Sequence, residues 1–405
     1  YAGGDMFSAR AFAGNFDTTE LLEAIDYCHI HNVKLYMAVN TLLKNSEMKK
    51  LIPYLEPFYR EGVDGIIVQD VGVIRSLSKA YPDLPLHGST QMSVCSTYGA
   101  EFLKNLGMTR FVPARELSLD EIKSIKEAVD IEIETFVHGA MCFCYSGKCL
   151  MSSFAGGRSG NRGRCAQPCR KAYNSKQFNH EYALSMKDMC TLASLPRLIE
   201  AGIDSFKIEG RMKKPEYVAA AVHAYSEITD ECINGHLNEK RIAYHTDRLM
   251  DIYNRGGFSS GYYYMKNGKE MLANERPNHT GTLIGKVEAV EAPFVYIRLE
   301  RGIQAKDVLE IRTGKEQNIE LTSNVTAQAG QKIRLNANNL RQIRKDMHVY
   351  RTRNNALIED IGVRFIQKEK QTDIYGKVTA KIGEPITLEL FSGVDNISVK
   401  VKGEC

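Results

Sequence analysis

The sequence predicts an α/β protein: a (β/α)8 TIM-like barrel, whose first strand and helix precede Tyr1, followed by a small all-β barrel module. Three observations support this prediction. Short apolar runs alternate with amphipathic stretches from residue 1 to about 275, which is typical of parallel βαβ units. Nearly every apolar run ends in polar residues, and from about 281 to 352 the apolar period becomes two. We therefore expect domains at 1–275 and 276–367, with 368–405 beginning a further, truncated β-rich domain.

The barrel elements are expected in a regular order along the chain. The strand candidates are 34–40, 65–70, 84–90, 110–116, 134–139 and 205–210. The helix candidates are 18–32, 47–62, 97–107, 118–129, 213–236 and 238–255. Asp17 and Ser118 are expected N-caps, and Gly62 and Gly107 are expected helix ends. With a short segment at Tyr1 the strands number seven, whereas a closed barrel needs eight; an open doubly wound sheet would also accept seven.

Polar residues at the strand ends favour the barrel, because the carboxyl ends of barrel strands converge on one mouth where active sites lie. The candidate catalytic residues there are His87, Gln91, Glu134, His138, Lys207, Glu209 and Arg211. Residues two apart on a strand share a face, so we expect Glu134 and His138 to point the same way, as Lys207, Glu209 and Arg211 should. A purely structural Lys–Glu pair is the alternative to a polar pocket that orients substrate, with a histidine as acid or base.

Composition bounds the class of protein. The chain has 405 residues, 43% of them hydrophobic, and a net charge of +4, which does not by itself imply nucleic acid. No apolar run approaches the roughly 20 residues that span a bilayer, so we expect no membrane contact. Half of the ten cysteines lie in one short stretch rather than spread as disulfide staples, which predicts a reducing, cytoplasmic location.

The cysteine-rich loop, residues 139–176, carries the most specific chemistry. Cys142, Cys149, Cys165 and Cys169 form a C-x6-C-x15-C-x3-C array. Structural zinc usually has two closely spaced pairs, whereas an iron–sulfur cluster accepts thiolates from irregular loop positions, so we favour the cluster and leave zinc, disulfides and free thiols open. Cys144 is an alternative ligand, and Cys190 is a second one, although a buried residue at a helix start is the favoured interpretation of Cys190.

The same loop is rich in arginine and contains no acidic residue after Gly156. Its candidate ligands of RNA or of an anionic substrate are Arg158, Arg162, Arg164 and Arg170. Three interpretations remain open here: contact with RNA phosphates, compensation of the negative charge of a thiolate cluster, and bidentate binding of a small carboxylate.

Several blocks of the sequence resemble one known family. ETFVHGAMCFCYSGKCLMSS resembles the signature of peptidase family U32, the collagenase-like proteases. Other blocks of that family are matched in order by NFDTTELLEAIDYCHIHNVKLYMAVNT, HGSTQMSV, PARELSLDEI, GRCAQPCRKAY and SFKIEGRMKKPEYVAA. The resemblance covers residues 1–275, and family members begin with one more strand and helix. The paired glycines of YNRGGFSSGYYY depart from the family, which leaves the conformation of that turn open.

The resemblance implies a chemistry other than the one in the family name. Characterised bacterial members are iron–sulfur proteins needed for oxygen-independent hydroxylation of a ribosomal RNA pyrimidine, a transfer RNA uridine or a ubiquinone precursor, and the RNA-modifying members require prephenate. It implies that Cys142, Cys149, Cys165 and Cys169 hold a 4Fe-4S cluster. The architecture is most similar to the long branch that makes 5-hydroxycytidine in ribosomal RNA, and we expect the arginine-rich loop and the β module to contact RNA. A collagenase-like peptidase and a non-catalytic RNA-binding protein are the alternatives.

Overall fold

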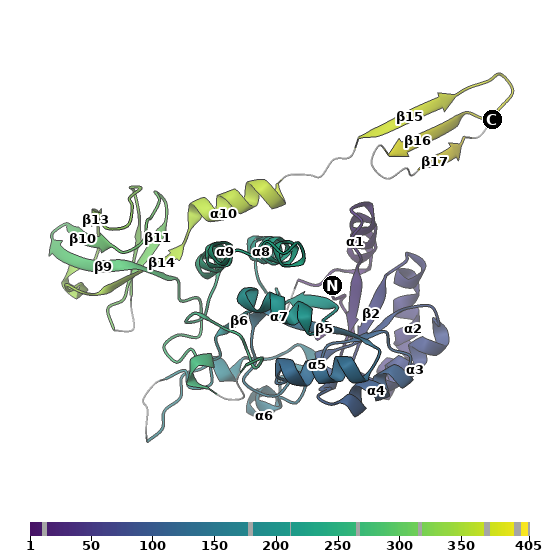
Figure 1. Ribbon diagram of the computed structural model, residues 1–405, viewed down its shortest axis with the longest axis horizontal. Helices are drawn as coiled ribbons and strands as arrows, with labels where there is room; N and C mark the ends of the chain where they lie inside the picture. The colour runs from purple at the N-terminus through teal and green to yellow at the C-terminus, as the bar shows by residue number, and fades with distance from the viewer. Residues whose placement is uncertain are drawn as a thin grey trace. The chain divides into compact units, whose positions relative to one another are not determined.

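The computed structural model describes residues 1–9, 14–176, 181–210, 212–264, 268–314, 318–367, 373–392 and 398–403. The chain divides into two units, Tyr1–Glu359 and Asp360–Cys405, and each is described by itself. The first unit begins as a mixed α/β structure built on a sheet of mainly parallel strands (Figure 1). No helix within the described residues is long and apolar enough to cross a bilayer.

The parallel strands of this sheet lie where the sequence predicts them. They are β1 (Tyr36–Val39), β2 (Gly65–Val68), β3 (Leu86–Gly88), β4 (Arg110–Phe111), β5 (Glu132–Ala140) and β7 (Ser205–Ile208). Strands β1 to β5 pair in chain order, and β7 pairs with β5. Ala2 forms a parallel bridge with Met37, so the first residues lie beside β1 as a short additional segment.

Helices follow the strands and pack against the sheet (Figure 1). They are α1 (Thr18–Ile30), α2 (Asn45–Arg60), α3 (Val71–Ala80), α4 (Thr97–Asn105), α5 (Leu119–Ala128), α6 (Met151–Gly156), α7 (Leu195–Glu200), α8 (Pro215–Ile233) and α9 (Glu239–Ile252). The predicted caps are confirmed: Asp17 and Ser118 each accept a backbone N–H in a capping box. Gly62 and Gly107 follow the ends of α2 and α4 with positive φ, which glycine adopts without steric cost.

A closed TIM barrel is not confirmed. Among the described residues no strand pairing joins β7 to the Tyr1 segment; instead the Tyr1 hydroxyl donates to Glu209 Oε2 at 3.2 Å. The sheet is also mixed, because β6 (Asp188–Cys190) runs antiparallel to the end of β5 and pairs with β8 (Phe258–Ser259). To close a parallel barrel, a further strand would have to pair with β7 on one side and with the Tyr1 segment on the other.

The last part of the first unit, from Thr282 to Arg353, is an antiparallel sheet, which we call the β module. Its strands, in sheet order, are β12 (Ile319–Thr322), β11 (Val308–Ile311), β14 (His348–Arg353), β9 (Thr282–Glu291), β10 (Phe294–Leu299) and β13 (Lys332–Asn336). Alternate residues such as Val295, Ile297 and Leu299 are buried in one core, as the period of two predicts. The predicted all-β module is thus supported in part, since no described strand pair joins β12 to β13 and closes a barrel.

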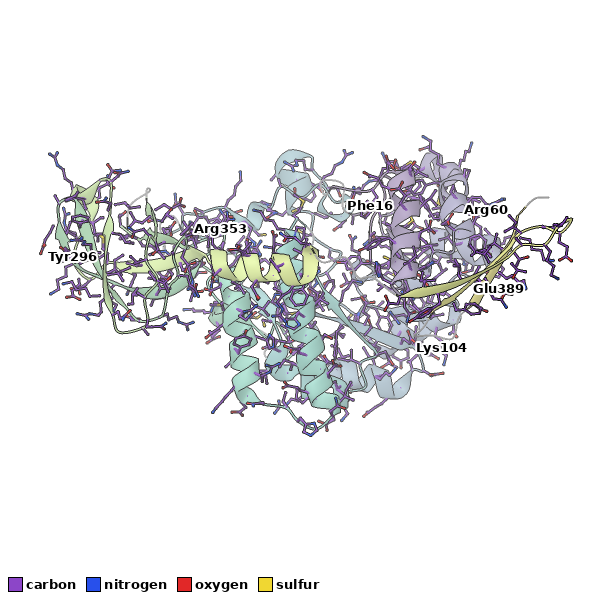
Figure 2. The ribbon with its side chains drawn as sticks, turned by 90° about the horizontal axis from the view of Figure 1, so that it is seen from above. Phe16, Arg60, Lys104, Tyr296, Arg353 and Glu389 are labelled. Carbon is purple, nitrogen blue, oxygen red and sulfur yellow. The ribbon has the colours of Figure 1, made fainter. Side chains whose placement is uncertain are left out.

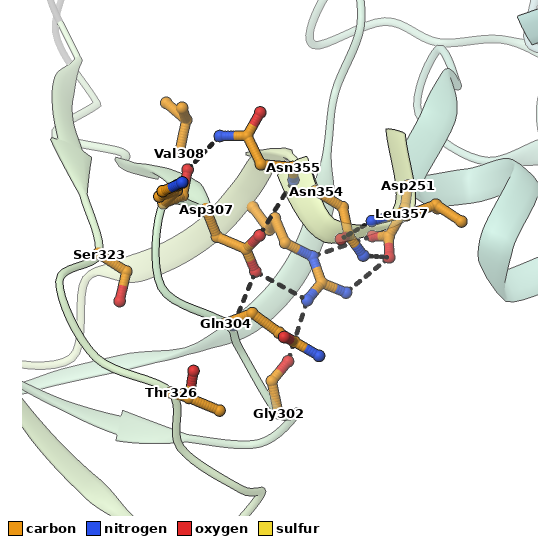
Figure 3. A network of polar contacts seen from close by, with 12 residues as sticks. Asp251, Gly302, Gln304, Asp307, Val308, Ser323, Thr326, Asn354, Asn355 and Leu357 are labelled. Atoms are coloured by element: carbon orange, nitrogen blue, oxygen red, sulfur yellow. Dashed lines mark hydrogen bonds and ion pairs between the residues drawn. The ribbon is translucent and has the colours of Figure 1, made fainter. Parts of the chain in front are cut away.

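A buried network of charges joins the β module to α9 (Figure 3). The Arg351 guanidinium on β14 lies between Asp251 of α9, at 2.6 Å, and Asp307 of the module, at 3.3 Å. The Asn354 side chain also donates to Asp251, at 2.9 Å. All three charged side chains are largely buried, so removal of one would leave an uncompensated charge in the interior. This network gives the module a defined orientation relative to α9.

The boundary between the two units falls within α10 (Asn355–Ile361), and the second unit contains three antiparallel strands. These are β15 (Ile374–Thr379), β16 (Thr387–Ser392) and β17 (Ser398–Lys402), paired in chain order. They agree with the β-rich character predicted for this stretch. The domain boundaries predicted at 275 and 367 stay predictions.

Candidate functional site

A cavity of about 1120 Å³ opens at the carboxyl ends of the parallel strands. Its wall brings together residues from separate strand ends, among them Asn40, Gln91, Arg115, Lys207 and Glu209. The cysteine-rich loop forms another part of the same wall. The sequence-based expectation that these strand ends converge therefore agrees with the geometry, although the catalytic role of each residue stays a prediction.

The cysteine-rich loop is fastened to the strand ends by its Ser146–Gly147 turn. The Ser146 backbone N–H and hydroxyl both donate to Glu116 Oε1, at 3.0 and 3.2 Å, and the Ser93 hydroxyl donates to the Ser146 carbonyl at 2.5 Å. Gly147 has a positive φ, and a Cβ there would lie 2.2 Å from the Gln91 carbonyl oxygen. Only glycine permits so close an approach, so the loop position depends on this residue.

Five thiols of the loop line the cavity: Cys142, Cys144, Cys149, Cys165 and Cys169. All five are free cysteines. Burial raises the pKa of the Cys169 thiol, and the neighbouring thiols of Cys142, Cys165 and Cys149 add to this rise, while Arg170 opposes it. Burial and the neighbouring Cys149 likewise raise the pKa of the Cys144 thiol. Among the described side chains, no group of three or more His, Cys, Asp or Glu residues is arranged to hold a metal ion.

A buried ion pair joins β5 to β7 at the wall of the cavity. Lys207 Nζ donates to Glu134 Oε1 at 2.5 Å, and both side chains are 8% exposed. Lys207 also lies 4.1 Å from the centre of the Tyr1 ring and lines the cavity, which Glu134 does not. Arg110 approaches Glu134 Oε2 at 3.8 Å. Glu134 thus compensates the charge of Lys207, as the structural interpretation of this pair expects.

His87 and His138 are both buried, and neither lines the cavity. Burial, with a contribution from Arg110, lowers the pKa of His87 to about 4. Burial lowers the pKa of His138 to about 3, so both rings are neutral at pH 7. A neutral, enclosed imidazole is typical of a packed core residue. The acid–base role expected of either histidine therefore has no support from its position.

The expectation that His138 shares a face with Glu134 is wrong. The register of β5 against β7 shifts between Phe136 and His138, which is a β-bulge. An extra residue in a strand turns the following side chains to the opposite side. The His138 ring consequently packs 5.6 Å from the rings of Tyr217 and Tyr225 on α8, whereas Phe136 lines the cavity.

The other predicted residues have varied positions. Gln91 lines the cavity, but its side-chain amide donates to the Asn40 carbonyl at 2.8 Å, so it braces two strand ends. Arg162 forms a 2.6 Å ion pair with Glu47 of α2, and Arg158 donates to the Arg164 carbonyl at 3.0 Å. Arg158, Arg162 and Arg164 do not line the cavity, whereas Arg170 does. Arg211 lies outside the described residues.

A cluster of three cations completes the cavity wall, and two of them, Lys213 and Arg255, were not predicted from the sequence. Lys213 and Arg255 line the cavity together with Arg170, and Asp188 of β6 lies beside them. Arg255 pairs with Asp188 at 2.5 Å. Burial raises the pKa of the Asp188 carboxyl, although Arg255 opposes this rise. Three cations therefore share one acidic neighbour.

Lys213 has the most unusual surroundings in this cluster. Its ammonium group lies 2.7 Å from the centre of the Tyr253 ring and has no carboxylate within 4 Å among the described residues. Burial and the charge of Arg255 lower its pKa to about 7. The NH1 group of Arg170 donates to Ser185 and to the Met186 carbonyl, and these bonds hold its planar side chain at the wall. The surplus positive charge can attract an anion.

The family of the chain follows from its sequence. Residues 1–273 match the profile of peptidase family U32. The chain belongs to this family. It is 39% identical over 242 residues to the tRNA hydroxylation protein P1 of Bacillus subtilis (strain 168), which covers 57% of this chain and 57% of that protein. It is 33% identical over 328 residues to the 23S rRNA 5-hydroxycytidine C2501 synthase of Escherichia coli (strain K12), which covers 78% of this chain and 49% of that protein.

This U32 chain spans about half the length of the curated relatives that it matches first. Among solved structures, that of a U32 peptidase shares 19% identity at a TM-score of 0.31, over 34% of this chain and 59% of that chain. The sequence relationship alone establishes the family.

Proposed function

We propose that the chain is an iron–sulfur RNA-modifying enzyme that hydroxylates C5 of a pyrimidine in ribosomal or transfer RNA without O2, in the cytoplasm. Prephenate is the proposed small anionic cosubstrate. The proposal is carried by one observation: the five loop thiols and the three cations Arg170, Lys213 and Arg255 line a single cavity. The RNA-hydroxylation names of the two relatives support the same chemistry.

The donor set is of the kind that holds an iron–sulfur cluster. Cys142, Cys149, Cys165 and Cys169 offer soft thiolates on one wall, and the Gln167 backbone N–H donates to Cys165 Sγ at 3.2 Å, as N–H groups do to cluster ligands. When bound, the cluster would supply one-electron redox chemistry.

The cation cluster suits a dicarboxylate such as prephenate. Arg guanidinium groups bind carboxylates through paired N–H donors, and the Lys213 ammonium adds a further donor. Arg170 and Arg255 are held by bonds to Ser185 and Asp188, so their orientation is fixed before the anion arrives. We assign these residues to binding and orienting the cosubstrate beside the thiols.

An aromatic rim suits the nucleobase. Phe143 and Tyr145 line the cavity and are 45% and 71% exposed. Exposed rings of this kind stack on unpaired bases, each contributing about 1–3 kcal/mol. A pyrimidine must leave its helix for chemistry at C5, so we assign the rim to holding the flipped base.

The peptidase reading rests on the family description. A peptidase site of the Ser–His or Cys–His type would need a histidine beside the nucleophile, and no histidine is among the described residues that line the cavity. In the non-catalytic interpretation the cluster only braces the loop, and the cations would only compensate its negative charge. The RNA hydroxylase therefore accounts for more of the cavity than either alternative does.

The test compares three proteins purified without air: wild type, Cys142→Ala/Cys149→Ala and the control Cys28→Ala/Cys95→Ala, which removes two cysteines outside the array. We expect about four irons and four sulfides per chain in wild type and control, and loss of both in the first variant. Mass spectrometry should then detect one added oxygen on RNA only with cluster-bearing protein and prephenate. Casein digestion that survives in the first variant, without RNA hydroxylation in any sample, would favour the peptidase instead.

A further inference from the structure

The positive charge of the chain is concentrated in the β module. Residues 281–353 contain thirteen lysines and arginines against eight acidic residues, an excess of +5, whereas the whole chain has a net charge of +4. The rest of the protein is therefore slightly acidic. Several of the acidic residues in the module are already paired: Asp307 with Arg351, Glu310 with Arg276, and Glu288 with Arg298.

A group of cations lies on the outer face of β10 and β13, where Lys332 is paired with Glu288 at 3.1 Å and Arg334 has no carboxylate within 4 Å among the described residues. Tyr296 lies directly across from Arg334 in this antiparallel pair, and β13 is an outer strand of the sheet. The Arg334 guanidinium lies 4.6 Å from the centre of the Phe294 ring, and Lys332 Nζ lies 4.8 Å from the centre of the Tyr296 ring. Figure 2 shows Tyr296 on the module. The rings hold the flexible cations over the sheet face at low entropic cost.

The loop after β13 extends this face. Arg341 and Lys345 are exposed on it, and neither they nor Arg334 have a carboxylate within 4 Å among the described residues. The Ala337 N–H donates to the Pro293 carbonyl at 3.3 Å, which keeps the loop beside the start of β10. We call Phe294, Tyr296, Lys332, Arg334, Arg341 and Lys345 the β13 surface.

We propose that the β13 surface binds the phosphate backbone of RNA and so docks the substrate on the module while the target base enters the cavity. Exposed cations spaced along an outer strand, with arginine and lysine laid over aromatic rings, match the charge and the planar groups of a polynucleotide. The Arg351 network fixes the module against α9. Thr352 and Arg353, at the end of β14, line the cavity, so the sheet that carries the β13 surface also contributes to the cavity wall. The identity of the partner as RNA rests on the proposed function.

The test measures binding of a fluorescent stem–loop RNA by anisotropy over a series of KCl concentrations. The variant is Arg334→Gln/Arg341→Gln/Lys345→Gln. The matched control, Lys49→Gln/Lys79→Gln/Lys240→Gln, removes the same charge from exposed positions on α2, α3 and α9. Each lost phosphate contact lowers the slope of log K against log salt by about 0.7–0.9, so we expect a decrease of about 2 and a roughly 10- to 100-fold weaker affinity in the variant only. Thermal melting checks that all three proteins are folded.

The outcomes separate this inference from the proposed function. If the variant alone loses affinity and slope, the inference stands, even where no sample hydroxylates RNA and the proposed function fails. Equal affinity and slope in variant and control would overturn the inference, whatever the hydroxylation result. Equally strong competition by polyglutamate and by unlabelled RNA would assign the surface to an acidic protein and overturn it too.

Discussion

Lys207 and Lys213 line the same cavity, yet their charges have opposite surroundings. Lys207 donates to Glu134 at 2.5 Å within the sheet, so its charge is compensated. Lys213 lies against the Tyr253 ring near two arginines, and its pKa falls to about 7 through burial and Arg255. This difference distinguishes a structural cation from a binding one. Lys207, paired with a carboxylate, braces the interior, whereas Lys213, which has no such partner, is suited to attract an anion.

The largest expected effect comes from breaking the compensated pair. Glu134→Ala leaves the buried Lys207 ammonium without its carboxylate, so we expect the free energy of unfolding to fall by about 3–5 kcal/mol. Urea unfolding followed by circular dichroism measures this loss. Adding Lys207→Met to the same protein should recover most of it, and Lys213→Met alone should cause no such loss. A stable Glu134→Ala protein would show that the pair does not brace the sheet.

A smaller effect is expected on anion binding from the uncompensated lysine. Lys213→Met removes a charged donor from the cluster, so prephenate should bind about 10- to 100-fold more weakly, or about 1.4–2.8 kcal/mol. The matched control is Lys214→Met, since Lys214 is the next residue, lines the cavity and is exposed. Isothermal titration calorimetry measures both. Equal affinities in the two variants would remove Lys213 from the proposed site.

The sequence predicts the parts of this cavity that follow from local patterns. Apolar runs locate the parallel strands, and the capping residues Asp17 and Ser118 locate two helix starts. Because parallel strands end at one edge of the sheet, the sequence alone predicts that Gln91, Lys207 and Glu209 lie together at the carboxyl ends of the strands. The period of two likewise predicts the strands of the β module.

Other features depend on geometry that no local pattern contains. The bulge in β5 carries His138 away from the cavity, and nothing in ETFVHG distinguishes it from a regular strand. Arg255 and Asp188 are brought together by β6 and β8, short strands of three and two residues without a periodic signal. One feature of the sequence does mark Arg255. It directly precedes the paired glycines of YNRGG, where the sequence departs from the family pattern.

The finest test of the comparison is the pH dependence of anion affinity. The pKa of Lys213 is lowered from 10.5 to about 7, so its ammonium is charged below that pH and neutral above it. Prephenate affinity should therefore fall by about threefold to tenfold as pH rises from about 6 to about 8, which calorimetry can follow. The stability of the free protein should change in the opposite sense. The unfolded lysine keeps its proton up to about pH 10.5, so the free energy of unfolding should rise between about pH 7 and pH 10.5.

The control variant Lys213→Arg keeps its charge throughout this pH range and should bind prephenate without the pH dependence of the wild-type affinity. If the Lys213→Arg protein showed the same fall in affinity as wild type, a group other than Lys213 would be titrating.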